Sequence, residues 1–131
     1  MGWWRDLFGG SARKDEQAAG VVTALRVRVS SDPSLGMARV TGIQQDGRRG
    51  MKAWISLDPA GEIRDSFFWH VHDLSVGDVV VIRSSVGFGP HTRRDDVIFI
   101  GSERGGPGVL DRIPARTVQR AARHDRRQQA G

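Results

Sequence analysis

Short runs of valine, isoleucine and phenylalanine, separated by turn-forming residues, are the feature that most restricts the fold of this chain. Candidate strands of this kind cover residues 21–30, 37–44, 51–57, 78–84 and 96–101. Glycine, proline and aspartate gather between the runs, where they favour turns over continued strand. Short strands with little helix between them are typical of a small barrel or sandwich. We therefore predict a mainly all-β domain, a small antiparallel β-barrel, over residues 20–102.

One segment, residues 62–74, fits two secondary structures. Ile63, Phe67 and Val71 recur at the spacing of an amphipathic helix. The run Phe67-Phe68-Trp69, however, consists of residues that favour strands, and a turn-forming Asp-Pro-Ala-Gly precedes it. We favour a strand over 66–72. If the segment is helical instead, the order of three strands, a helix and two strands is that of the OB-fold, so the barrel is expected to be OB-like or SH3-like.

The N-terminal residues 1–19 predict a short helix and a flexible connection. Trp3, Trp4, Leu7 and Phe8 fall on one face of a helix, and so short a helix must dock on a surface to be stable. The glycines that follow predict that the helix ends there and that a tether continues to residue 19. The surface is either the chain's own barrel or an external one. For an external surface, we expect the four apolar residues to bind a protein partner, a second copy of the chain or, as a weaker option, a membrane.

Positive charge is concentrated in residues 111–131, within the predicted C-terminal segment 103–131. The chain has a formal net charge of +5, and residues 111–131 carry six arginines against two aspartates. A glycine-rich turn at 105–108 precedes a predicted amphipathic helix over 113–128, with Pro114 in its first turn. A cationic segment on a nearly neutral domain is typical of proteins that contact a polyanion, although a solubilising tail has the same composition.

Alternation within the predicted strands indicates a possible binding face. In strand 51–57 the apolar residues belong inside, which turns Lys52 and Trp54 outward. In strand 66–72, Phe67 and Trp69 are expected inside and Phe68 outside. Outward aromatic rings among cationic side chains suit single-stranded nucleic acid, because bases stack on the rings while cations neutralise phosphates. The alternative is that Trp54 lies beneath a terminal helix. The predicted nucleic-acid-binding residues are Arg26, Arg28, Lys52, Trp54, Phe68, Arg116, Arg120, Arg123, Arg126 and Arg127.

Two histidines offer the only arrangement that suggests a metal. His70 and His72 would share one strand face, and Asp73 or His91 could complete a set of ligands. The pattern resembles the metallo-β-lactamase and cupin motifs only superficially, because the residues that should follow are missing. We expect exposed or half-buried histidines and no bound metal or other cofactor. The glycine loop 87–90 precedes a strand rather than a helix, so we do not expect it to bind phosphate.

Several function classes are disfavoured by composition. The chain has no cysteine, which excludes disulfides and thiolate catalysis, and no spacing of serine, histidine and carboxylates indicates a catalytic set. No apolar run approaches the length of a membrane span, so we expect a cytoplasmic protein. The favoured hypothesis is a non-catalytic module that binds single-stranded nucleic acid or RNA. The alternative is an interaction or assembly module anchored by its N-terminal helix, and a metal-dependent enzyme ranks third.

Overall fold

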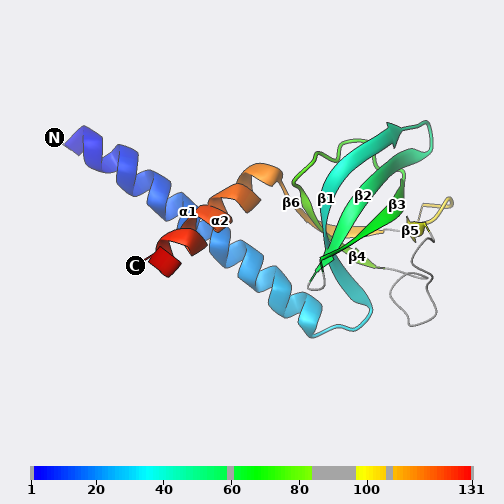
Figure 1. Cartoon of the computed structure of the whole chain (residues 1–131), viewed down its shortest axis with the longest axis horizontal. Coiled ribbons are helices and arrows are strands. Elements are labelled where there is room, and N and C mark those ends of the chain that lie inside the picture. Colours follow the sequence, from blue (N-terminus) through cyan, green and yellow to red (C-terminus); the bar gives the residue numbers. More distant parts are fainter. Residues whose placement is uncertain (1, 59–60, 84–96, 106–107, 131) are drawn as a thin grey trace.

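The computed structural model describes residues 2–58, 61–83, 97–105 and 108–130, with side chains described from Ala12 onward. The elements are α1 (Gly2–Ser30), β1 (Leu35–Asp46), β2 (Gly50–Asp58), β3 (Glu62–Trp69), β4 (Val79–Arg83), β5 (Ile98–Ile100), β6 (Val109–Ile113) and α2 (Ala115–Ala130). The strands form a body from which the two helices extend together (Figure 1).

The strands make one six-stranded sheet in the order β5-β3-β2-β1-β4-β6. Neighbouring strands are antiparallel except β3 and β5, which run parallel. Irregularities in the β1–β2 register occur between Val40 and Gly42 and between Ile43 and Gln45, and such bulges increase the local twist of a strand. The sheet curls into a half-barrel (Figure 1). The prediction of a small, curled β domain is thus confirmed for the sheet-forming part of the chain, with β6 as a strand that the sequence analysis missed.

The inside of the half-barrel holds the larger hydrophobic core. Alternate residues of each strand fill it, as the two-residue period of a strand requires. Its fully buried members include Val40, Ile55, Phe68, Ile82 and Ile100. At one side, Gly108 lies so close to the backbone of Gly101 that a Cβ atom at position 108 would collide with it. The residue that precedes β6 therefore lies directly against the residue that follows β5.

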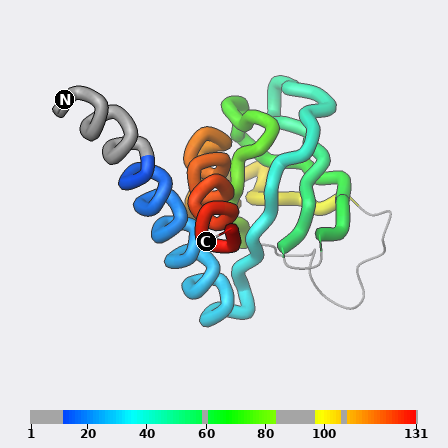
Figure 2. Tube along the Cα trace, turned by 60° about the vertical axis from the view of Figure 1, so that its left-hand side comes forward, coloured from blue at the N-terminus to red at the C-terminus, as the bar shows by residue number. Residues whose placement is uncertain are grey.

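A second apolar cluster joins the sheet to the helices. Met37, Val79, Val81 and Ile113 lie on the outer face of β1, β4 and β6, and Leu25 of α1 packs on them. The α1 and α2 helices also pack against each other, and Figure 2 shows the pair on one side of the sheet. One half of the outer face is therefore covered by the helical pair.

The strand predicted at residues 21–30 is wrong, because α1 continues through this segment. The segment alternates like a strand, yet Val22, Leu25 and Val29 also follow helical spacing, and these three belong to the cluster on the sheet. Val27, which the strand pattern would bury, is 61% exposed. The tether predicted over 9–19 is also helical, so the intrinsic cost of glycine in a helix, about 1 kcal/mol, does not end α1 there.

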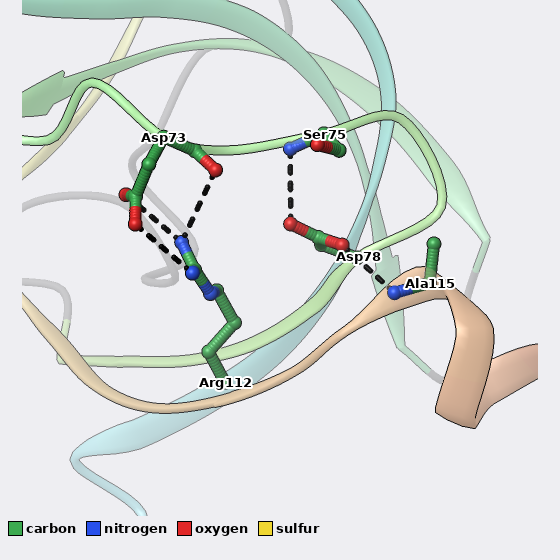
Figure 3. A network of polar contacts seen from close by, with 5 residues as sticks. All are labelled: Asp73, Ser75, Asp78, Arg112 and Ala115. Atoms are coloured by element: carbon green, nitrogen blue, oxygen red, sulfur yellow. Dashed lines mark hydrogen bonds and ion pairs between the residues drawn. The ribbon is translucent and has the colours of Figure 1, made fainter.

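The C-terminal part of the chain forms the helix α2 over Ala115–Ala130, whereas the helix predicted over 113–128 began within what is β6, and a carboxylate marks the start of α2. Oδ1 of the buried Asp78 accepts a hydrogen bond from the backbone N–H of Ala115 at 2.8 Å, and its Oδ2 accepts one from the N–H of Ser75 at 2.9 Å (Figure 3). A carboxylate at this position satisfies a donor that the helix itself leaves without a partner. Arg112 forms an ion pair with Asp73 at 2.9 Å, which ties β6 to the loop before β4 (Figure 3).

Candidate nucleic-acid interface

The outer face of β2, β3 and β5 carries aromatic side chains where the other half of the sheet carries helices. Trp54 and Phe99 are 43% and 50% exposed, and Phe67 and Trp69 are half-buried beside them. The helices lie on the side of the sheet formed by β1, β4 and β6 (Figures 1 and 2), and they line a cavity with β2 only at its last residues, 56–58. We call Trp54, Phe67, Trp69 and Phe99 the aromatic face.

Phe67 lies at the centre of this face. Its ring centroid is 4.8 Å from that of Trp69, with an interplanar angle of 77°, and 6.2 Å from that of Phe99. The parallel pairing of β3 with β5 sets Phe67 directly opposite Phe99, and the antiparallel pairing with β2 sets it opposite Lys52. The contact with Trp69 is edge-to-face and the contact with Phe99 is tilted, and such contacts between rings restrict the orientation of the Phe67 side chain.

The β1–β2 hairpin adds cationic side chains at one end of the aromatic face. A cavity of about 350 Å³ opens there, lined by Gln45, Gly47, Arg48, Arg49, Gly50, Lys52 and Phe67. Gly50 is required for this shape, because a Cβ atom at its position would collide with the carbonyl oxygen of Phe68 and press on the ring of Phe67. The cavity therefore combines an aromatic ring with three cations.

The three cations differ in what they contact. Lys52 Nζ is 3.4 Å from Oδ2 of Asp65, and NH1 of Arg49 is 3.5 Å from Oε1 of Glu103. Asp65 also accepts a hydrogen bond from the Gln44 side-chain amide at 2.8 Å. Arg48 is exposed and has no hydrogen bond or ion pair with any residue that the structure describes. The positive charge of the cavity is thus partly neutralised by nearby carboxylates.

The orientation predicted for Phe68 is wrong. Its exposed fraction is 0%, and it lies in the core with Ser66 and Arg64 on the same side of β3. Phe67 and Trp69, which the sequence analysis placed inside, face outward instead. Two polar residues therefore lie on the inner side of β3, where the alternation rule predicts apolar ones. The buried hydroxyl of Ser66 is satisfied there, because it donates a hydrogen bond to the carbonyl oxygen of Ala53 at 2.7 Å.

The structure divides the remaining predicted nucleic-acid-binding residues between two places. Lys52 and Trp54 lie at or beside the aromatic face, as their strand alternation indicated. Arg26 and Arg28 are exposed on α1, away from it: Arg26 lines a separate cavity of about 320 Å³ between the helices and the sheet, and Arg28 is 3.8 Å from Asp111. Five more lie on α2, which is also remote from β3 and β5 (Figure 1): Arg116, Arg120, Arg123, Arg126 and Arg127.

Two of the α2 arginines hold a buried carboxylate. Asp15 of α1 is 2% exposed, and its oxygens contact NH2 of Arg123 at 3.4 Å and NH2 of Arg127 at 2.5 Å. Burial raises the pKa of Asp15, but the hydrogen bonds and charges of the two arginines outweigh that effect, so the pKa lies below its ordinary value. Part of the C-terminal positive charge therefore joins the helices to each other.

The histidines have separate partners. Nδ1 of His72 is 2.8 Å from Oδ1 of Asp46, while Nε2 of His70 is 2.7 Å from the carbonyl oxygen of Glu103. Within the described ranges, no three histidine or acidic side chains are grouped to hold a metal ion. His91 and the glycine loop 87–90 lie outside the described residues, as do the side chains of Trp3, Trp4, Leu7 and Phe8.

Comparison with known proteins assigns the chain to no group. No protein-family model matches it, and neither a curated protein nor a solved structure shows significant similarity. Across the part of the chain that the structure covers, neither helix is both long and apolar enough to traverse a bilayer. Any statement about function therefore depends on the chemistry of the site itself.

Proposed function

We propose that this protein is a non-catalytic module that binds single-stranded nucleic acid on the aromatic face and in the cavity of the β1–β2 hairpin. The observation that carries the proposal is the exposed group of aromatic rings around Phe67 beside Arg48, Arg49 and Lys52. Bases stack on such rings with about 1–3 kcal/mol each, while the cations neutralise the phosphates between them.

The strand arrangement supports this assignment. We infer that the curled sheet is an OB-like barrel, because β1, β2 and β3 form a meander, β1 also pairs with β4, and β5 returns beside β3. Barrels of this kind bind oligonucleotides on the face of the second and third strands and on the loop between the first two. The aromatic face and the hairpin cavity occupy these positions.

Double-stranded nucleic acid fits the site poorly. Stacked and paired bases within a duplex are not free to contact protein rings, whereas the bases of a single strand are. The carboxylates of Asp65 and Glu103 also reduce the positive charge that would attract a duplex backbone. We therefore expect stacking to contribute more to affinity than charge does.

The test is a fluorescence titration with single-stranded and duplex oligonucleotides of the same sequence. The wild-type protein should bind the single strand more tightly, and Phe67→Ala or Trp54→Ala should weaken binding by about 1–3 kcal/mol. Val76→Ala is the matched control, because Val76 is 57% exposed but lies in the loop before β4. Equal affinity for both oligonucleotides, or equal effects of all three substitutions, would contradict the proposal.

A second candidate function is assembly through the N-terminal part of α1. One observation favours it: the helical backbone is continuous from Gly2, so the spacing of Trp3, Trp4, Leu7 and Phe8 defines a single helical face. Large apolar residues on one face favour docking to a partner or a second copy. Deleting residues 1–9 should abolish self-association in analytical ultracentrifugation and leave cooperative unfolding intact; loss of cooperative unfolding would show that the segment stabilises the fold instead.

A further inference from the structure

Glu103 places a negative charge at the edge of the hairpin cavity. Its carboxylate is 3.5 Å from NH1 of Arg49, and the two side chains are 66% and 72% exposed. Arg49 lines the cavity, so it is one of the cations that a ligand phosphate would contact. A phosphate at Arg49 must compete with this carboxylate.

His70 forms hydrogen bonds to the backbones of both Arg49 and Glu103. Its backbone N–H donates to the carbonyl oxygen of Arg49 at 2.8 Å. Its Nε2 is 2.7 Å from the carbonyl oxygen of Glu103, and because a carbonyl only accepts, Nε2 is the donor. His70 has a φ of 60°, a conformation that non-glycine residues seldom adopt and that is found at functional sites more often than elsewhere. The backbones of Arg49 and Glu103 are therefore held close together, which keeps their side chains within reach of each other.

The adjacent cation lacks such a partner. Arg48 forms no ion pair with any described residue, although it lines the same cavity. A single phosphate can therefore contact Arg48 with the Arg49–Glu103 pair intact. A second phosphate on the same strand can contact Arg49 only if it displaces the carboxylate of Glu103.

We propose that Glu103 is a competitor built into the site, whose carboxylate occupies Arg49 until a ligand with consecutive phosphates displaces it. This inference rests on the proposed function. It specifies the ligand class as an oligonucleotide rather than a mononucleotide, because only a chain of phosphates reaches Arg48 and Arg49 together. It also couples binding to the loop at residues 101–105, since the displaced Glu103 no longer joins that loop to the hairpin.

The experiment measures the affinity of the wild-type protein and of Glu103→Gln for a single-stranded oligonucleotide at several salt concentrations. Exposed ion pairs contribute little, so the variant should bind about two- to fivefold more tightly. In the wild-type protein the displaced carboxylate takes up a cation, which offsets the counterion release at one phosphate, so the plot of log K against log salt should be steeper for the variant by about 0.7. A nucleoside monophosphate should bind both proteins equally.

Two controls separate competition at Arg49 from a general change of charge. Glu16→Gln removes the same charge from an exposed position on α1 and should leave affinity unchanged. In an Arg49→Ala background, Glu103→Gln should have no effect. A gain in that background, an equal gain for Glu16→Gln, or an equal gain for the monophosphate would overturn the inference.

The remaining outcomes distinguish the inference from the proposed function. Tight binding by the wild-type protein with no change in Glu103→Gln would overturn the competition and leave the proposed function standing. Absence of binding by both proteins at low salt would overturn the proposed function, and the inference with it.

Discussion

The two halves of the outer sheet face carry different kinds of apolar side chain. On β1, β4 and β6, Met37, Val81 and Ile113 are buried beneath the helical pair. On β2, β3 and β5, Trp54 and Phe99 remain about half exposed. Flexible and aliphatic side chains fill the covered half, whereas the open half carries aromatic rings together with the exposed Ile63 of β3.

Under the proposed function, this difference assigns stability to one half of the sheet and ligand recognition to the other. Aliphatic side chains pack closely against a helix but offer a ligand no directional contact. Aromatic rings present flat faces and ordered edges, so they can hold a ligand while staying in place through contacts with each other. The covered half should therefore govern stability, and the open half should govern binding.

The largest effect expected is on the covered half. Ile113→Ala removes a side chain that is 2% exposed and should lower the free energy of unfolding by about 2–5 kcal/mol. Phe99→Ala on the open half should lower it by less than about 1 kcal/mol, as for most surface substitutions. Urea unfolding monitored by circular dichroism compares the two. Similar losses would show that the open face is also part of the core.

The next effect concerns the junction between the sheet and α2. Asp78→Ala removes the acceptor for the N–H groups of Ala115 and Ser75 and should cost about 0.5–2 kcal/mol of stability. Asp125→Ala, at an exposed position within α2, is the control and should change stability by less than about 0.5 kcal/mol. Equal effects would mean that the cap does not fix the start of α2.

A smaller, stabilising effect is expected in α1. Gly20 lies within the helix with open space where a Cβ would be, so Gly20→Ala should raise the free energy of unfolding by about 0.4–1 kcal/mol. Gly61 has similar space but a φ of 71°, so Gly61→Ala should be destabilising. Thermal unfolding compares the two variants. If Gly20→Ala does not raise the free energy of unfolding, the residues near Gly20 are not helical in solution.

The last prediction concerns how the stability of the helical pair depends on pH, an effect that appears only in acid. The pKa of Asp15 in the folded protein is lowered below its ordinary value of 3.8, so its contribution is fully present above about pH 4 and is lost as the pH falls through the lower, folded-state value. The stability difference between the wild-type protein and Asp15→Asn should therefore be constant from pH 7 to 5 and shrink below pH 4. A difference that stays constant down to pH 2 would contradict the pairing with Arg123 and Arg127.

The sequence was sufficient to locate most of the strands but not their inner and outer faces. In β2, the alternation of Met51, Ala53 and Ile55 with more polar residues identifies the inner face. In β4, four consecutive apolar residues are all buried, so the sequence alone does not separate its two faces. In β3, three consecutive aromatic residues satisfy either orientation. The orientation observed puts Arg64 and Ser66 inside with Phe68, and only tertiary contacts, such as the bond from Ser66 to Ala53, make this favourable.

The candidate site could be predicted only in part, because only some of its residues lie in a strand with a clear apolar and a clear polar face. Lys52 and Trp54 were placed outward because their strand has a single amphipathic register. Arg48 and Arg49 were missed because they lie in a turn, where no period applies, and Phe99 because its strand is only three residues long. Arg123 and Arg127 were assigned to a ligand because nothing local indicates that Asp15, more than a hundred residues away, would pair with them.

That pairing has a consequence for how the chain acquires its structure during synthesis. Asp15 and Arg127 are 112 positions apart, so α1 leaves the ribosome long before α2 is made. Until then, the side of α1 that carries the buried Asp15 has no helix to cover it. Contacts so distant in sequence also close slowly, because the intervening chain must first be ordered. The nascent protein therefore completes its fold only after translation has reached α2, and the side of α1 that α2 covers stays open to chaperones throughout that interval.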